Sequence, residues 1–377
     1  MSKNISEIPV TEIIERSQKL ARTGNNTFEK IRGIVQDVYL REIPSKFDWD
    51  FLLVSSSFTT LAEYKIGTAS VNTGASSVTF SSDVTLDASY VGRKISFSAT
   101  GEVYTINSFS SAQAVTVIPS FRGTNNVSNG AYTIFQNVYP LSSNFDRFPK
   151  NGGVYRWEGG KKVGMKEEPY RQYLDDSTYS PTPIPEKVRL SGADTAGNQQ
   201  IEMIPPPSTD RNYGYDYFKQ LYPLMETTAG TLSSISALAT SVVGNSNSKF
   251  LDIYRSHSSN SLWFRVDNIG VGADSQWYRV LNISHDSALT LATVFANTAI
   301  TSSANYTLAE APDMPVRLHT GILYGTIRIL NVDQNDEHYA LYHTQYYQVL
   351  SDSKRIYVSR PYGIEIEGIH EEFRYRY

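Results

Sequence analysis

The sequence contains no cysteine and no apolar run long enough to cross a membrane as a helix. Neither a disulfide framework nor thiolate chemistry is therefore available, and a membrane span would need roughly 20 successive apolar residues. The first residues lack the apolar segment of a signal peptide, so we expect none. Charged residues make up only 19% of the chain and the net charge is −4, which gives no indication of a polyanion-binding protein.

The motifs of common catalytic and metal sites are also missing. His338 and His343 are five residues apart, whereas two zinc ligands on one helical face are spaced by four. Gly159 and Gly160 precede two lysines without the glycine spacing or the following Ser/Thr of a phosphate loop, and they indicate a hairpin turn instead. We therefore predict no catalytic residue, no metal site and no cofactor, and we do not expect an enzyme.

Tyrosine is abundant, with 26 residues among 377. Ser, Thr, Asn and Gly are frequent in the segments that alternate polar and apolar residues. This composition is typical of β modules and of protein–protein surfaces, where Tyr is enriched.

Residues 313–350 are typical of two helices joined by a polar turn. Asp313 is a suitable N-cap, and Pro315 would lie in the first turn, where its missing N–H costs nothing. The first helix contains Gly321 and Gly325, each of which should cost about 1 kcal/mol relative to alanine. We interpret this pair as a site of close contact with a second helix. One stripe of the following helix carries Tyr339, His343, Tyr346 and Leu350.

Two amphipathic helices are expected at the front of the chain. Thr11 would cap the first, which would end at Gly24, and Thr27 would cap the second, which would end at Pro44. A single helical bundle that joins both ends of the chain is the simplest way to bury all four apolar stripes.

The residue pattern changes to a period of two between Leu61 and about Val138, which predicts an antiparallel sandwich or barrel. A similar pattern returns later at a constant offset of 174 residues. Tyr104 corresponds to Tyr278 at this offset, and Val117 corresponds to Leu291. Identical spacing over about thirty positions favours a duplicated module over convergent β patterning. Between the two modules, Pro-rich segments precede short strand candidates of a small sheet.

The predicted fold class is α+β, with a helical bundle of N- and C-terminal helices, a small sheet, two related inserted antiparallel β-sandwich or barrel modules, and an extended C-terminal arm. The predicted divisions are N-terminal helices 1–60, first β module 61–139, small sheet 140–226, second β module 227–312, helical hairpin 313–352 and arm 353–377.

The C-terminal arm ends in alternating aromatic and basic residues. Its last five residues place three aromatics on one face and two arginines on the other: Phe373, Arg374, Tyr375, Arg376 and Tyr377. An apolar edge strand of this kind favours pairing with another chain. Closure of the chain's own small sheet is the alternative.

The order of these segments resembles that of head-to-tail adaptor (connector) proteins of tailed bacteriophages. The resemblance rests on the helical opening with its SKFDWDFL stretch, on segments of the first module and small sheet, and on the closing helical pair with its tail. The quoted segments are Ser45–Leu52, Val91–Ile95, Glu102–Ile106, Tyr139–Leu141, Asn144–Arg147, Pro185–Leu190, Ile201–Pro207 and Tyr213–Tyr217. A simple adaptor would lack the second β module.

The resemblance implies a structural virion protein without catalytic residues. Such adaptors form a homo-oligomeric ring, commonly a dodecamer, between the portal protein and the tail or its nozzle or stopper protein. DNA passes through the central channel without sequence-specific binding. The expected location is the neck of the virion after assembly in the host cytoplasm, with no membrane partner. The alternative is a carbohydrate-binding host-recognition tail protein built on the two β modules.

Overall fold

The computed structural model describes residues 7–21, 27–150, 153–167, 180–253, 261–267, 276–296, 298–301, 303–332 and 337–358. The protein is mixed α+β with more strand than helix, and it contains several antiparallel sheets and one half-barrel sheet. The chain divides into two compact units. Unit 1 comprises Met1–Phe51 and Leu221–Tyr377, and unit 2 comprises Leu52–Gln220.

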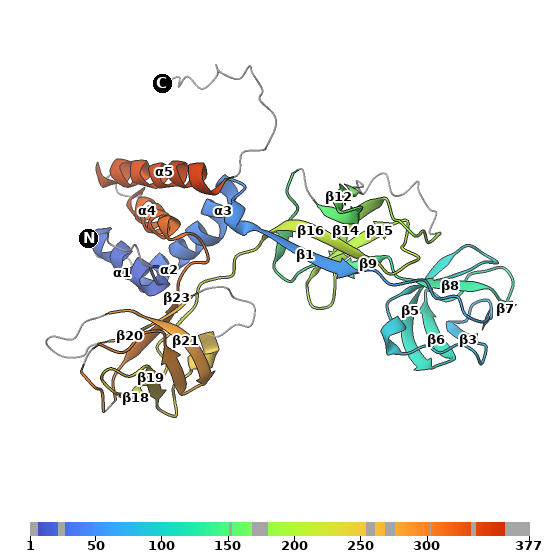
Figure 1. Cartoon of the computed structure of the whole chain (residues 1–377), viewed down its shortest axis with the longest axis horizontal. Helices are drawn as coiled ribbons and strands as arrows, with labels where there is room; N and C mark the ends of the chain where they lie inside the picture. Colours follow the sequence, from blue (N-terminus) through green and yellow to red (C-terminus); the bar gives the residue numbers. More distant parts are fainter. Residues whose placement is uncertain are drawn as a thin grey trace, which may run out of the picture. The chain divides into compact units, whose positions relative to one another are not determined.

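The helices of unit 1 come from both ends of the chain (Figure 1). Those from the front are α1 (Val10–Leu20), α2 (Phe28–Asp37), the π-helical turn η1 (Val38–Glu42) and α3 (Ile43–Lys46). A short 3-10 turn, η2 (Asp50–Leu52), follows at the boundary between the units. The closing pair is α4 (Val316–Val332) and α5 (Glu337–Tyr357).

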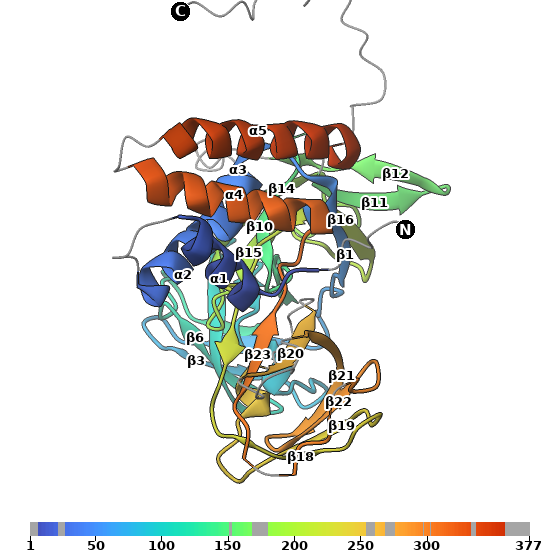
Figure 2. The same cartoon turned by 90° about the vertical axis from the view of Figure 1, so that its left-hand side faces the viewer.

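The front and closing helices pack against each other through their apolar faces. Figure 2 shows α4 and α5 side by side, with α1 and α2 against the other side of α4. The apolar positions of these helices are buried, and they include Ile13, Ile14, Ile31, Val35, Leu318, Ile322, Leu323, Ile327 and Leu330. The residues that set the 3.6-residue period in the sequence are therefore the residues that hold the helices together.

Two of the predicted N-caps are wrong. Helix α1 begins at Val10 with Pro9 as its N-cap, and the Thr11 hydroxyl instead donates to Glu226 Oε2. Helix α4 begins at Val316, directly after Pro315, while the Asp313 N–H donates to the Tyr39 hydroxyl at 3.2 Å. At Thr11 the tertiary bond occupies the hydroxyl that would have served as the cap. At Asp313 the bond holds the backbone at a position before the helix begins. The Thr27 cap of α2 is confirmed, because its side chain accepts the Lys30 N–H.

The other helix ends also differ from prediction. Pro44 does not end the second helical segment, because it occupies the first turn of α3, where a proline needs no N–H partner. The sequence predicts that the C-terminal arm begins at residue 353, but α5 continues to Tyr357. Ser353 is buried, and the Tyr357 ring lies 6.4 Å from that of Phe51, so tertiary packing extends the helix.

Unit 2 contains two small sheets. The five-stranded sheet has the order β1-β16-β11-β12 with β10 on β16, and the four-stranded sheet has the order β13-β14-β15-β9. The strands are β1 (Leu53–Thr59), β9 (Val138–Pro140), β10 (Phe145–Arg147), β11 (Val154–Glu158), β12 (Lys161–Gly164), β13 (Lys166–Glu167), β14 (Lys187–Ala193), β15 (Gln199–Ile204) and β16 (Asn212–Lys219). The strand candidates of the Pro-rich region are thus confirmed. Residues 187–190 lie in β14, residues 200–204 in β15, and the alternation of Tyr213, Tyr215 and Tyr217 in β16.

These sheets change the expected division of the chain. Residues 53–59, assigned to the N-terminal helices, form strand β1 and pair with β16 along its whole length. The sequence-based division placed the small sheet with the helices, whereas the structure places it in unit 2 with the first β segment. The Tyr213, Tyr215 and Tyr217 alternation explains this grouping, because all three rings are buried in the core of unit 2.

The first seven-stranded sheet lies in unit 2 and has the order β7-β2-β3-β6-β5-β4-β8. Its strands are β2 (Ala69–Val71), β3 (Ser77–Phe80), β4 (Lys94–Phe97), β5 (Val103–Ser111), β6 (Ala114–Ile118), β7 (Val127–Gly130) and β8 (Tyr132–Phe135). A 3-10 turn, η3 (Ala88–Tyr90), precedes β4. Only one residue separates β7 from β8, so one segment supplies both ends of the sheet.

The second seven-stranded sheet lies in unit 1 and has the order β17-β23-β20-β21-β22-β19-β18. Its strands are β17 (Glu226–Thr227), β18 (Leu232–Ile235), β19 (Ser241–Gly244), β20 (Leu262–Val266), β21 (Tyr278–His285), β22 (Ala288–Leu291) and β23 (Tyr306–Glu310). A 3-10 turn, η5 (Phe250–Ile253), lies between β19 and β20.

The two seven-stranded sheets share a strand order and a register. The order β2-β3-β6-β5-β4-β8 corresponds to β18-β19-β22-β21-β20-β23. In the first sheet Ile106 pairs with Val117, and 174 residues later Val280 pairs with Leu291. The register shifts that follow also occur at positions related by 174 residues. The offset read from the sequence therefore relates paired positions in three dimensions.

Candidate interaction surface on the helical part

Among the described residues, directed hydrogen bonds join the segment that contains α1, α2 and α3 to the segment that contains α4 and α5. The Ile8 N–H donates to His319 Nδ1 at 3.0 Å, and the Asp313 N–H donates to the Tyr39 hydroxyl. Arg328 Nη2 donates to both Glu42 carboxylate oxygens at 2.7 and 2.8 Å. Each contact joins residues that are more than 270 positions apart, so these helices are fixed to one another by directed bonds as well as by apolar packing.

His319 is a fully buried polar residue on α4 that sequence reasoning did not identify. Because Nδ1 accepts the Ile8 N–H, the neutral ring carries its proton on Nε2, which lies 3.1 Å from the carbonyl oxygens of Pro312 and Met314. Burial lowers the pKa of the imidazole below its ordinary value. The folded protein thus holds a neutral histidine that bridges the start of the chain and the start of α4.

This bridge predicts a loss of stability in mild acid. A histidine whose pKa is lower in the folded state stabilises fully above its unfolded pKa of about 6.5 and loses that contribution as the pH falls. One such group changes the free energy of unfolding by at most about 1.4 kcal/mol per pH unit. We expect melting temperatures measured from about pH 7.5 to about pH 5.5 to fall less in His319→Gln than in the natural chain. Parallel curves for the two proteins would exclude this role for His319.

Gly321 and Gly325 lie on the face of α4 that contacts other helices. A Cβ atom built at Gly325 would lie 2.9 Å from Val38 Cγ1 and 3.0 Å from Tyr346 Cε2. At Gly321 the nearest atom would be Val349 Cγ1, at 3.3 Å. Gly325 therefore stands where η1, α4 and α5 meet, and Gly321 faces α5.

The predicted stripe of α5 divides into a buried part and an accessible part. Tyr346 and Leu350 are buried, and the Arg328 guanidinium lies 4.7 Å from the Tyr346 ring centre. Tyr339, His343 and Tyr347 follow one another at four-residue spacing, with ring centres 5.5 and 4.7 Å apart. Tyr347 is 39% exposed, and the other two are half-buried. We call Tyr339, His343 and Tyr347 the aromatic stripe.

The aromatic stripe has the chemistry of a protein-binding surface. Lys46 Nζ lies 5.7 Å from the Tyr347 ring centre, so a cation borders one end of the stripe. Tyrosines provide large contact areas and are enriched at protein interfaces. Of the two histidines whose spacing does not fit a zinc site, His343 belongs to this stripe and His338 precedes it.

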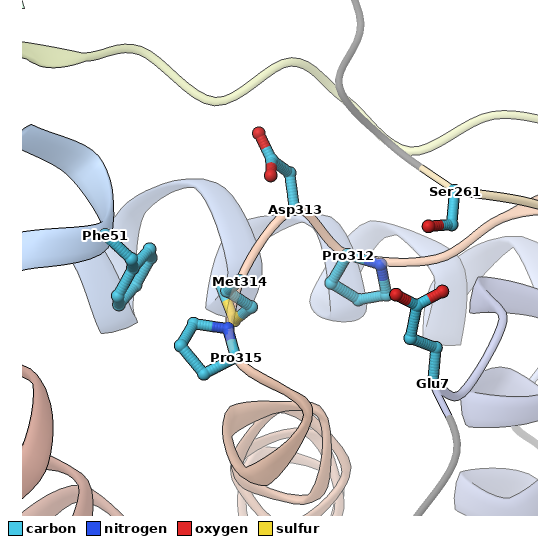
Figure 3. A pocket seen from close by; sticks show the side chains of 7 residues that line it. All are labelled: Glu7, Phe51, Ser261, Pro312, Asp313, Met314 and Pro315. Atoms are coloured by element: carbon cyan, nitrogen blue, oxygen red, sulfur yellow. The ribbon is translucent and has the colours of Figure 1, made fainter. Parts of the chain in front are cut away.

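A small cavity of about 220 Å³ lies near the start of α4 (Figure 3). Its lining residues are Glu7, Phe51, Ser261, Pro312, Asp313, Met314 and Pro315. Figure 3 shows Glu7 and Ser261 on one side and the Phe51 ring on the other. The Trp263 indole N–H donates to the Glu7 carboxylate at 3.0 Å. This hydrogen bond links the second seven-stranded sheet to the residues before α1. The lining contains no histidine that could act as a base for Ser261.

A larger, polar cavity of about 780 Å³ lies between α1, α2 and the second sheet. Arg265 forms a bidentate ion pair with Glu15 of α1 and a second pair with Asp267. Burial raises the pKa of the Glu226 carboxyl, which accepts the Thr11 hydroxyl. These contacts fix the second sheet to α1, so the polar residues of the cavity serve as structural links.

The terminal residues Phe373, Arg374, Tyr375, Arg376 and Tyr377 lie outside the described residues, which end at residue 358. Within the described ranges, His, Asp and Glu side chains form no group of three or more that could hold a metal ion. The same part of the chain contains no helix that is both long and apolar enough for a membrane span. No protein family and no curated protein sequence matches the chain.

Proposed function

We propose that this chain is a structural virion protein, a head-to-tail adaptor that forms a ring between the portal protein and the tail of a bacteriophage. The observation that carries the proposal is the packing of the helices. Helices α1 and α2 from the front of the chain pack against α4 from the opposite end of the sequence, and α4 packs in turn against α5. In this proposal the helices form a bundle that builds the ring, and the two seven-stranded sheets are duplicated modules inserted into that frame.

Several properties of the helical part suit a ring-forming body. The directed contacts of His319, Tyr39 and Arg328 hold the helices in one arrangement, so every copy would present the same surfaces. The aromatic stripe offers an accessible contact area on α5. A dodecamer is the proposed assembly, with DNA passing through its channel and with no catalytic role for the chain.

The alternative, saccharide recognition by the sheets, has less support. Carbohydrate binding would need exposed aromatic faces on which sugars could stack. Among the described residues of the two seven-stranded sheets, Phe109 is the most exposed large aromatic residue. The aromatic residues Trp263 and Trp277 of the second module are half-buried. One exposed ring with half-buried neighbours does not form a stacking platform, and we therefore favour the adaptor.

The proposal is tested by electron microscopy of the purified chain with the portal protein of the same particle. We expect closed rings with a central channel that add to one end of the portal. Images in which the portal remains bare at saturating concentrations of the chain would contradict the proposal.

The C-terminal arm is proposed to dock on a neighbouring virion protein. Because α5 ends at Tyr357, which packs against Phe51, deletion of the residues after 358 should leave the melting temperature unchanged. We expect the shortened chain to lose binding to its partner ring in a pull-down. Substitution of Phe373, Tyr375 and Tyr377 by serine in the full chain should reproduce this loss. Undiminished docking by either variant would refute the role of the arm.

A further inference from the structure

The shared register of the two seven-stranded sheets allows equivalent positions to be compared within one chain. Interior positions keep their apolar character: Tyr104 and Tyr278, Val115 and Leu289, Val117 and Leu291, Phe121 and Phe295, and Ile134 and Leu308 are all buried. Tyr104 accepts the Arg122 N–H at 3.1 Å, and Tyr278 accepts the Ala296 N–H at the same distance. The equivalence therefore extends beyond the strands to the loop after β6 and β22.

Five exposed positions differ in character between the sheets. The first sheet carries polar residues or glycine at these positions, and the second carries leucine or valine. The pairs are Gly74 and Leu238, Thr79 and Val243, Asp87 and Leu251, Asn107 and Leu281, and Ser120 and Val294. All ten are exposed, with Leu238 at 74%, Leu281 at 71% and Val294 at 48%. The fold does not require an apolar residue at any of these positions, because the first sheet forms with polar residues or glycine there. The Leu238 N–H donates to Phe295, next to Val294, and the strands of Val243 and Leu281 both pair with β22. We call the five residues of the second sheet the leucine surface.

Leu238 also adopts a backbone conformation that disfavours leucine. Its φ is +60°, in the left-handed region, and its N–H donates to the Phe295 carbonyl oxygen at 2.9 Å. Gly74 has a φ of +81° and makes the same bond to Phe121 in the first sheet. Glycine is the residue that accommodates this turn without strain. The second sheet therefore keeps an exposed, strained leucine that folding does not explain.

The first sheet has exposed apolar residues of its own, but at other positions. They are Ile66, Val91, Phe109 and Ile118. Both sheets therefore expose apolar side chains, but they do so at different positions. The positions of the leucine surface are apolar only in the second sheet.

We propose that the leucine surface binds the aromatic stripe of a second copy of this chain. The inference rests on the proposed function and names the surfaces by which one copy would meet the next. A ring needs a heterologous contact, in which one surface of a subunit meets a different surface of the next subunit. The two surfaces must therefore be held in a fixed arrangement within each copy. The leucine surface and the aromatic stripe both belong to unit 1 and are linked through α1 by the Arg265–Glu15 and Trp263–Glu7 contacts.

The chemistry of the two surfaces is complementary. One presents aliphatic side chains without charge, and the other presents rings that can cover them at little desolvation cost. Lys249 pairs with Asp286 at one border of the leucine surface, where exposed Asp252 also follows Leu251. Exposed Lys46 lies beside Tyr347 at a border of the stripe. Opposite charges at the rims of two apolar surfaces favour a defined orientation.

The test uses the full chain and replaces the leucine surface by residues of the first sheet. The variant Leu238→Gly/Leu281→Asn/Val294→Ser should weaken self-association at least tenfold in sedimentation velocity. Its melting temperature should equal or exceed that of the natural chain, because the turn at residue 238 loses its strain. A control, Ile66→Ser/Val91→Ser, removes exposed apolar area from the first sheet and should associate normally.

A mixing experiment identifies the opposing surface. Tyr339→Gln/Tyr347→Gln should also weaken self-association, because it removes the other half of the contact. An equimolar mixture of the two defective variants retains one intact pair of surfaces, so it should form heterodimers and no larger species. A mixture that stays monomeric, a leucine-surface variant that associates normally, or a natural chain that is monomeric at every concentration would overturn the proposal.

The ring itself is measured separately by electron microscopy with the portal protein. Rings formed by the leucine-surface variant would remove this inference and leave the adaptor proposal standing. Absence of rings from the natural chain would remove the adaptor proposal.

Discussion

Replacement of Gly325 by valine is expected to destabilise the helical part by about 3 kcal/mol, the upper part of the range for overpacking a tight site. A Cβ at this position already lies 2.9 Å from Val38 and 3.0 Å from Tyr346, and valine adds two further methyl groups to this crowded site. The better helix propensity of valine offsets only a few tenths of this cost. Urea denaturation followed by far-ultraviolet circular dichroism measures the effect, because the described helices belong almost entirely to unit 1.

Gly321→Ala is the matched control on the same helix. Its Cβ would lie 3.3 Å from the end of the Val349 side chain, a contact that a small shift can relieve. The gain in helix propensity, about 1 kcal/mol, opposes the remaining crowding, so we expect a net change within about 1 kcal/mol of zero. Equal stability of Gly325→Val and the natural chain would show that α4 does not approach η1 and α5 this closely.

Replacement of Trp49 by alanine is expected to destabilise unit 1 by about 4 kcal/mol, as large-to-small changes of buried aromatics do. The indole is fully buried, its N–H donates to the Ile43 carbonyl at 2.8 Å, and its ring contacts those of Phe47 and Phe51 at 5.2 and 5.7 Å. The substitution leaves a cavity among these groups and removes the donor for a carbonyl near the end of the helical segment.

Trp157→Ala removes the same side chain from a different environment. Trp157 is 56% exposed on β11 of unit 2, and exposed positions usually change stability by less than about 0.5 kcal/mol. Calorimetric scans of both variants should show a lowered transition for Trp49→Ala only. Similar losses in the two proteins would mean that Trp49 does not anchor the segment after α3.

Periodicity predicted the helices because it reports which face is buried, whatever the partner of that face. Ile13, Ile31 and Ile327 lie on the apolar stripes of the expected helices, and all three are buried. Helix caps were less predictable, because a capping side chain can form its hydrogen bond either with the nearby helix backbone or with a residue far away in the sequence. Thr11 bonds to Glu226, 215 residues away, and no local pattern reports such a partner.

The candidate surface was predictable to a similar extent. The paired glycines indicated a tight site on α4, and the repeat of offset 174 indicated equivalent strands. His319 was missed, because a single histidine in an apolar stripe has no distinctive spacing. The leucine surface needed the structure as well, since the equivalence of Leu238 and Gly74 depends on matched hydrogen bonds rather than on the main offset.

An engineered disulfide between residues 38 and 325 tests most directly whether the two ends of the chain form one helical body. The chain has no cysteine, so Val38→Cys/Gly325→Cys introduces a single possible pair. A sulfur in the place of Val38 Cγ1 would lie about as far from the second Cβ as a disulfide requires. We predict that oxidation of the dilute, folded protein links the two residues within one chain, detected as faster migration on a non-reducing denaturing gel. Two thiols that stay free in the folded monomer would contradict the packing of α4 against the helices from the front of the chain.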